Sequence, residues 1–186
     1  MPELKRTMQL FHGSYCAVAA PDLSKCARFK DFGRGFYLTS SEEQARSFAR
    51  ISTRKAIENG QIPAQDYGVV STFICTDPSP LQIMDYPAAD ADWLHCVVGH
   101  RKSHTFPELV QRLQPYDVIS GKIANDRTNA TITAYMLGTF GEINTADADR
   151  ICISLLIPDR LQDQFCFRTL KALAALTFKR SEKVWL

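Results

Sequence analysis

The sequence predicts one α+β domain, on two observations. Its 186 residues, 45% of them hydrophobic, suffice for one well-buried core but are few for two. Short runs rich in β-branched and aromatic residues, typical of strands, are interspersed with stretches whose apolar residues recur at helical spacing. No repeat or low-complexity tract interrupts this pattern, so we expect residues 1–186 to form a single domain.

The first elements expected are a strand at 8–14, a loop at 15–34 and a strand at 35–39. The loop is long for a compact domain, which makes it a candidate functional segment. A helix should follow, because a capping box begins at Ser40 and the stop signal Asn59-Gly60 ends the pattern. The inward stripe expected for this helix is Ala45, Phe48, Ala49, Ser52 and Ala56.

In the middle of the chain, the β-branched run at 68–75 predicts a strand, and 81–86 predicts another. Asp90 should begin a helix, because the apolar residues after it have helical spacing. These residues are Trp93, Leu94, Val97 and Val98. Residues 105–108 place a proline in the first turn of a further helix, and 117–123 is strand-like.

The remaining elements expected are helices at 126–137, 145–157 and 169–176, with strands at 164–167 and 177–186. The second of these helices should turn five residues inward. They are Ala148, Ile151, Cys152, Leu155 and Leu156.

The overall charge favours neither a nucleic acid nor a membrane as partner, because 22 basic and 20 acidic residues leave a formal charge of +2. The N-terminus lacks the apolar core of a signal peptide, and no run approaches the roughly 18 apolar residues of a membrane span. We therefore expect a cytoplasmic protein without a membrane partner. Six scattered cysteines with no Cys-x-x-Cys pair favour free thiols.

Two motifs carry the strongest functional signal. They are Phe11-His12-Gly13-Ser14, at the end of the first strand, and Phe32-Gly33-Arg34-Gly35-Phe36-Tyr37-Leu38-Thr39, which leads into the second. His12 can donate to a ribose hydroxyl, and Gly13 lets a planar amide approach the backbone for paired hydrogen bonds. Tyr37 offers a ring face for stacking. Taken singly, each of these residues also suits an ordinary core position.

Together the motifs resemble the NAD-binding cleft of the ADP-ribosyltransferases, most closely the His-Tyr-Glu branch that includes diphtheria toxin and the poly(ADP-ribose) polymerases. The resemblance implies a split β-sheet core with surrounding helices. It implies that His12 binds the ribose, that Gly13 binds the nicotinamide carboxamide, and that Tyr37 stacks on the ring. The other NAD⁺-binding residues that it implies are Ser14, Gly35, Phe36 and Thr39.

The third motif of that family is a Glu-bearing strand near the C-terminus, and only residues 162–172 are similar to it, with Gln164 in place of Glu. An amide can hydrogen-bond the 2′-hydroxyl of the ribose, but it brings no charge to an oxocarbenium-like transition state. A shift by one residue would use Asp163, which on a strand faces the opposite side. The candidate catalytic residues are therefore His12, Tyr37 and Gln164, and a carboxylate at 164 is expected to hold or raise cleavage.

A further polar segment, Asn125-Asp126-Arg127-Thr128-Asn129, stands at the expected start of a helix. An arginine there can clamp a pyrophosphate or a target carboxylate, although a plain N-cap by Asp126 with a solvated Arg127 is an equal alternative. The order of all these motifs resembles a group of bacterial toxin-like ADP-ribosyltransferase domains. That resemblance implies NAD⁺ as substrate, Asp126 and Arg127 at its site, a protein or nucleic-acid acceptor, and a neutralising antitoxin.

Three functions remain open from the sequence. The leading one is a mono-ADP-ribosyltransferase that cleaves NAD⁺ at the nicotinamide–ribose bond; the others are an NAD⁺- or ADP-ribose-binding module without turnover and an NAD⁺ glycohydrolase. A metal site is not expected, because His100 and His104 lack partners at a recognised spacing and the neighbouring Arg101-Lys102 repels cations. A Rossmann fold is not expected either, since Gly33-Arg34-Gly35 precedes a strand and not a helix.

Basic side chains gather in two segments, where they form either a solvated face or a docking surface for an acidic or nucleic-acid target. They are Lys25, Arg28, Lys30 and Arg34 in the loop, and Arg46, Arg50, Arg54 and Lys55 in the first helix.

Overall fold

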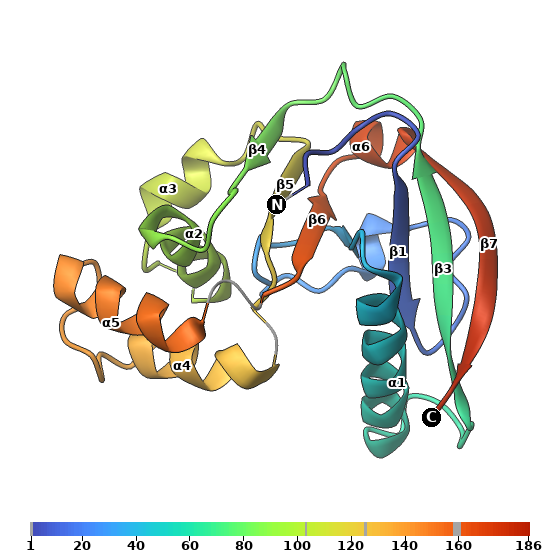
Figure 1. Ribbon diagram of the computed structural model, residues 1–186, viewed down its shortest axis with the longest axis horizontal. Helices are drawn as coiled ribbons and strands as arrows, with labels where there is room; N and C mark the ends of the chain where they lie inside the picture. Colours follow the sequence, from blue (N-terminus) through green and yellow to red (C-terminus); the bar gives the residue numbers. More distant parts are fainter. Residues whose placement is uncertain (1, 103, 125, 158–160) are drawn as a thin grey trace.

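A computed structural model describes residues 2–102, 104–124, 126–157 and 161–186 and confirms the α+β class. It contains two β-sheets (Figure 1). The first sheet has the order β1-β3-β7 and is antiparallel throughout. Its strands are β1 (Gln9–Ser14), β3 (Tyr67–Cys75) and β7 (Leu176–Trp185).

The second sheet has the order β2-β6-β5-β4, in which only β4 and β5 are parallel. Its strands are β2 (Phe36–Leu38), β6 (Asp163–Phe167), β5 (Val118–Lys122) and β4 (Ile83–Asp85). The strand that carries the second motif is thus the hydrogen-bonded neighbour of the strand that carries the third. Residues about 130 apart in the sequence therefore lie side by side.

A shared apolar cluster fills the interior between the sheets. Leu10 of β1 and Phe73 of β3 enter it from one sheet, and Phe36, Phe165 and Phe167 enter it from the other. Because side chains alternate along a strand, Gly13 of β1 faces away from this interior and His12 faces toward it. The ring centroids of His12 and Phe36 are 4.5 Å apart.

Helix α1 (Glu42–Glu58) covers the other face of the first sheet, and two glycines allow it to approach closely. A Cβ on Gly13 would lie 2.1 Å from the carbonyl oxygen of Ala45, and one on Gly68 would lie 2.6 Å from that of Ala49. The helix correspondingly buries small residues. They are Ala45, Ala49, Thr53 and Ala56.

The outer face of the second sheet is covered by the helical half of the molecule (Figure 1). This half comprises α2 (Ala91–Arg101), α3 (Pro107–Arg112), α4 (Asp126–Met136) and α5 (Ala146–Leu156). As predicted, α2 begins after its cap Asp90 and buries its apolar residues. The remaining elements are the 3-10 turn η1 (Leu23–Lys25) and the short helix α6 (Leu170–Ala174), which follows β6.

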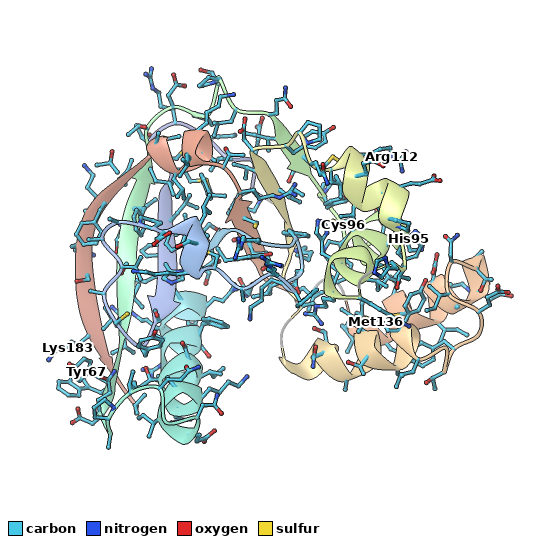
Figure 2. All side chains as sticks on the ribbon, turned by 180° about the vertical axis from the view of Figure 1, so that it is seen from behind. Tyr67, His95, Cys96, Arg112, Met136 and Lys183 are labelled. Carbon is cyan, nitrogen blue, oxygen red and sulfur yellow. The ribbon has the colours of Figure 1, made fainter. Side chains whose placement is uncertain are left out.

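Every predicted strand and helix is present, but three predicted inward side chains are wrong. Phe48 is 46% exposed, because the glycine-lined face of the sheet admits only the smaller side chains of α1. On α5, Ile151 and Leu155 are 39% and 54% exposed. That helix instead turns Asp149 inward, where the carboxylate accepts a hydrogen bond from His95 Nε2 at 2.8 Å. His95 is labelled on the helical half of the molecule in Figure 2.

The N-cap of α1 is Ser41, one residue later than predicted. The hydroxyl of Ser40 is engaged elsewhere, because it donates to the carboxylate of Asp163. The six cysteines are free thiols, as predicted. None of the described helices has the length and apolar character needed to cross a membrane.

Candidate functional site

The two sheets meet where β1 lies beside β2. Phe11 and Thr39 form a β-bridge there, with N···O distances of 2.8 Å from Phe11 N–H to Thr39 C=O and 3.0 Å in return. Within the described residues, this bridge is the only strand pairing between the two sheets. The pairing of β1 with β2 therefore stops directly beyond it.

This end of the bridge leaves a gap in the strand pairing, and Gly13 lies on its β1 side. Continued pairing would join Gly13 to Tyr37, but the carbonyl of Tyr37 instead accepts a hydrogen bond from Nδ1 of His12, at 2.8 Å. Alternate residues of a strand turn their N–H and C=O toward the same side. Gly13 therefore directs both groups, as Phe11 does, away from β3. A backbone donor and a backbone acceptor stand side by side at this edge.

The His12 side chain lies on the interior side of β1, against Phe36, as a neutral imidazole. Burial lowers the pKa of His12 below its ordinary 6.5. Because Nδ1 donates to the Tyr37 carbonyl, it carries the proton, and Nε2 holds a lone pair. The sequence predicts a donor to a ribose hydroxyl; the structure makes Nε2 an acceptor for the hydroxyl hydrogen.

Acidification should destabilise the fold through buried imidazoles. Burial lowers the pKa of both His12 and His100 from 6.5, so below that pH the unfolded chain binds more protons than the folded one. The free energy of unfolding that these two histidines contribute is therefore fully present above about pH 7. It is lost as the pH falls through 6.5 toward their pKa values in the folded state. Urea midpoints at pH 7.5, 6.5 and 5.5 test this. His100→Asn should make the urea midpoint depend less steeply on pH, whereas His104→Ala, at an exposed position, should leave that dependence unchanged. A wild-type midpoint that does not change with pH would contradict the prediction.

The hydroxyl of Tyr37 fastens the loop that precedes β2. It donates to the carbonyl of Gly33 at 2.8 Å and accepts from the N–H of Phe32 at 2.9 Å. Burial raises the pKa of Tyr37 well above its usual 10, so the phenol stays protonated. Since both hydrogen-bonding roles of the hydroxyl are taken, only the ring remains to interact with a ligand.

Tyr37→Phe should lower the free energy of unfolding by about 1–3 kcal/mol, because the buried N–H of Phe32 loses its partner while the ring remains. Urea denaturation measures the loss. Tyr67→Phe is the matched control, as the Tyr67 hydroxyl has no hydrogen bond within the described part of the chain and its ring contact with Lys183 would persist. Equal stability of the two variants would refute the fastening role.

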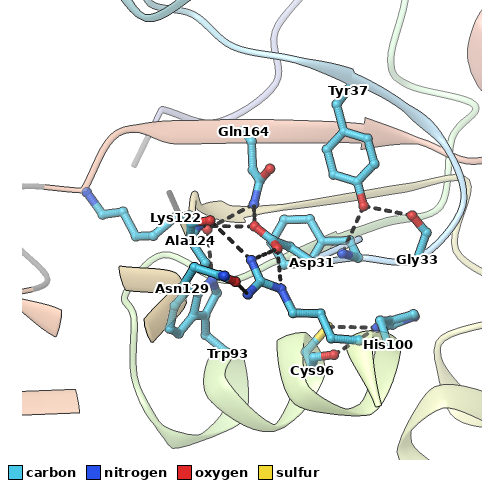
Figure 3. A network of polar contacts seen from close by, with 12 residues as sticks. Asp31, Gly33, Tyr37, Trp93, Cys96, His100, Lys122, Ala124, Asn129 and Gln164 are labelled. Carbon is cyan, nitrogen blue, oxygen red and sulfur yellow. Dashed lines mark hydrogen bonds and ion pairs between the residues drawn. The ribbon is translucent and has the colours of Figure 1, made fainter. Parts of the chain in front are cut away.

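Asp31 anchors a buried polar network beside Tyr37 (Figure 3). Its side chain is 8% exposed, and its Oδ1 accepts from Arg101 Nε at 2.8 Å and from an Arg101 terminal nitrogen at 2.6 Å. Its Oδ2 accepts from the N–H of Ala124 at 3.1 Å. Arg101 also donates to the side-chain oxygen of Asn129 at 2.7 Å. One carboxylate thus joins the loop before β2 to α2 and to the segment that enters α4.

Gln164 of β6 belongs to this network. Its Nε2 donates to Asp31 Oδ2 at 2.7 Å and to the carbonyl of Lys122 at 3.2 Å. Two acceptors therefore fix the orientation of the amide and leave Oε1 as its acceptor. Because Tyr37 pairs with Cys166, two residues beyond Gln164, the side chains of Tyr37 and Gln164 share one face of the sheet (Figure 3).

Asp163 contacts different groups from those of Gln164. Its carboxylate accepts from the Thr39 hydroxyl at 3.0 Å and from the Ser40 N–H at 2.9 Å. The Thr39 hydroxyl oxygen also accepts from the N–H of Ser41 at 3.1 Å. Both residues therefore secure the start of α1, which accounts for Thr39 and Asp163 without a ligand.

The other predicted site residues lie around the same junction. Gly35 presses against β6, where a Cβ would be 2.4 Å from Cys166 Sγ; Phe36 packs on His12; and Ser14 ends β1. The structure thus gathers His12, Gly13 and the backbone of Tyr37 at the gap. It groups the Tyr37 ring with Gln164 and Asp31 on the other face of β2.

Asp126 and Arg127 stand at the first turn of α4, but their side chains lie outside the described residues, as does Asn125. Their predicted roles remain predictions. Among the residues that are described, no three potential ligands come together as a metal site, and His104 lies beyond the end of α2.

Sequence reasoning missed Asp31 and Arg101. Asp31 directly precedes the second motif, so its position was the available signal. Arg101 occupies the last position of an apolar helix, and its buried role depends on the path of a loop 70 residues away.

The fold defines the chain as an α+β protein whose two sheets are joined by a β-bridge beside a His-Gly strand end. By its sequence the chain belongs to the family DUF3990, described as a protein of unknown function, whose model matches residues 8–178. No curated protein matches the chain.

Proposed function

We propose that this protein is a mono-ADP-ribosyltransferase that cleaves NAD⁺ at the nicotinamide–ribose bond and transfers ADP-ribose to a macromolecule. The observation that carries the proposal is the gap at Gly13. A carboxamide has one N–H face and one C=O, which complement a backbone C=O and N–H on one strand residue. In the second sheet, the ring of Tyr37 on β2 and the amide of Gln164 on β6 lie on neighbouring strands.

In this reaction the bond between the ribose C1′ and the nicotinamide nitrogen breaks, and its electron pair leaves with neutral nicotinamide. A nucleophile of the acceptor then bonds to C1′ and releases its proton. Gly13 would hold the carboxamide, and His12 Nε2 would accept a ribose hydroxyl hydrogen. Gln164 Oε1 would accept the 2′-hydroxyl hydrogen, while Tyr37 supplies the ring contact.

Asp31 would supply the negative charge that a glutamate on β6 would otherwise provide. Its carboxylate stands 2.7 Å from Gln164 Nε2, so a negative charge lies directly behind the amide. A nearby anion favours the positive charge that develops on the ribose. We therefore assign to the Asp31–Gln164 pair the electrostatic role that the resembled family gives to one glutamate.

Arg101 favours the alternative of a binding module or a slow NAD⁺ glycohydrolase. It places a guanidinium against the Asp31 carboxylate, 2.6 Å away, and partly offsets its charge. Turnover would then be weak even where NAD⁺ binds. The remaining parts of the proposal rest on the family resemblance: a cytoplasmic, toxin-like role, a protein or nucleic-acid acceptor, a neutralising antitoxin, and NAD⁺ contacts by Ser14, Asp126 and Arg127.

The test is incubation of the protein with adenine-labelled NAD⁺ and a cell lysate. A transferase should label a macromolecule, and Tyr37→Ala should abolish the label while Tyr37→Phe, which keeps the ring, retains most of it. Free ADP-ribose without a labelled macromolecule would identify a glycohydrolase. Binding without either product would identify a binding module, and the absence of binding would refute the proposal.

A further inference from the structure

A cavity of about 610 Å³ lies apart from the strand gap, between the loop before β2, the end of α2, α3 and the residues after β6. Three arginines line it: Arg28 and Arg34 from the loop, and Arg168 after β6. No aspartate or glutamate is among its described lining residues. A chain with a net charge of only +2 thus concentrates three guanidinium groups around one hollow, which favours a phosphate-bearing ligand.

His100 lines this cavity and carries an unpaired acceptor. The residue is 9% exposed, and its Nδ1 donates to the carbonyl of Cys96 at 2.9 Å. Its Nε2 is buried and has no hydrogen-bond partner among the described residues. Burial is the main reason that the pKa of His100 is lowered, and the charge of Arg168 lowers it further. The hydrogen bond to Cys96 and the charge of Asp31 act in the opposite direction without reversing the shift. The neutral Nε2 therefore calls for a hydroxyl or N–H donor, since buried polar atoms are rarely left unpaired.

The rim of the cavity carries an aromatic platform. Phe29 lines it and is 65% exposed, although it is a large apolar side chain. Gly33, at φ +77°, lies against the His100 ring, where a Cβ would be 2.7 Å from Cδ2. An exposed ring can stack on a planar base. Guanidinium donors, one buried acceptor and a ring face together match the phosphate, ribose and base of a nucleotide.

We propose that this cavity binds a nucleotide, with its phosphates on Arg28, Arg34 and Arg168, a sugar hydroxyl on His100 and its base on Phe29. The volume lies within the range of small-molecule sites. The cavity uses none of the residues at the Gly13 gap; as a site for part of NAD⁺ it rests on the proposed function, and as a site for another nucleotide it is independent of it. The nucleotide is either the adenylate portion of NAD⁺ or a separate molecule.

Isothermal titration with ADP, pyrophosphate and adenosine tests the site. ADP should bind more tightly than either part, and Arg28→Gln/Arg34→Gln should weaken ADP and pyrophosphate at least tenfold. Phe29→Ala should weaken ADP but not pyrophosphate. The matched control is Arg54→Gln/Arg150→Gln, which removes two exposed arginines elsewhere and should leave ADP binding within twofold of wild type.

Competition identifies the source of the nucleotide. If NAD⁺ displaces ADP, the cavity takes the dinucleotide; if NAD⁺ and ADP bind together, it takes a separate nucleotide. Failure of ADP and pyrophosphate to bind at millimolar concentration, or unchanged binding in the loop arginine variant, would overturn the proposal. Neither result depends on turnover, so nicotinamide binding at Gly13 can fail while ADP still binds here.

Discussion

Gly13→Ala should lower the free energy of unfolding by on the order of 3 kcal/mol or more, because the new methyl group has no space. Its Cβ would lie 2.1 Å from the carbonyl oxygen of Ala45 and 2.8 Å from the amide nitrogen of Ala49, both backbone atoms of α1. Relief requires the whole helix to move off the sheet. Urea denaturation followed by circular dichroism measures the effect.

Substitutions at two other glycines give a comparison for the stability lost in Gly13→Ala. Gly68→Ala meets the same helix, with a Cβ 2.6 Å from the Ala49 carbonyl oxygen, and should be comparably harmful. Gly60→Ala has open space and only a positive φ to oppose it, so it should cost about 1 kcal/mol. If Gly13→Ala were as mild as Gly60→Ala, α1 would not rest on β1 as described. Because Gly13 serves packing, its substitution cannot isolate a role in ligand binding.

Gln164→Glu should also destabilise the protein, by about 2–4 kcal/mol, and it should reduce the NAD⁺ cleavage that we propose. The sequence alone leads to the opposite expectation, that a carboxylate here would hold or raise cleavage. In the structure Nε2 donates to Asp31 Oδ2 and to the Lys122 carbonyl. A glutamate oxygen in its place would face two acceptors, one of them charged, in a buried site.

The double variant Asp31→Asn/Gln164→Glu tests the cause. Asparagine can donate to the new carboxylate, and its oxygen can still accept from Arg101, although the N–H of Ala124 would lose its acceptor. The double variant should therefore recover part of the stability and activity lost in Gln164→Glu. Simple additivity of the two single changes would contradict a direct Asp31–Gln164 interaction.

Local patterns predicted the order of strands and helices because their signals are local. The capping box before α1, Asp90 before α2 and the β-branched run of β3 act within a few residues. The inward faces of α1 and α5 depended on distant groups. Gly13 and Gly68 select the small face of α1, and the hydrogen bonds from His95 and Tyr135 draw Asp149 of α5 inward.

The candidate site was predictable only in part for the same reason. The His-Gly and Gly-Phe-Tyr motifs marked the junction of the sheets, and Gln164 marked its neighbour strand. The tautomer of His12, the engagement of the Tyr37 hydroxyl and the carboxylate of Asp31 arise from contacts between separate segments. No spacing within one segment encodes such contacts.

In the proposed function, the gap in pairing beyond the Phe11–Thr39 bridge receives the carboxamide of nicotinamide. Titration of ¹⁵N-labelled protein with nicotinamide tests it most directly, with nicotinic acid as the matched ligand, since a carboxylate has no N–H for the Gly13 carbonyl. We expect a saturable shift of the Gly13 amide resonance with nicotinamide and a much weaker one with nicotinic acid. An unperturbed Gly13 resonance at millimolar nicotinamide, or equal shifts with both ligands, would contradict it.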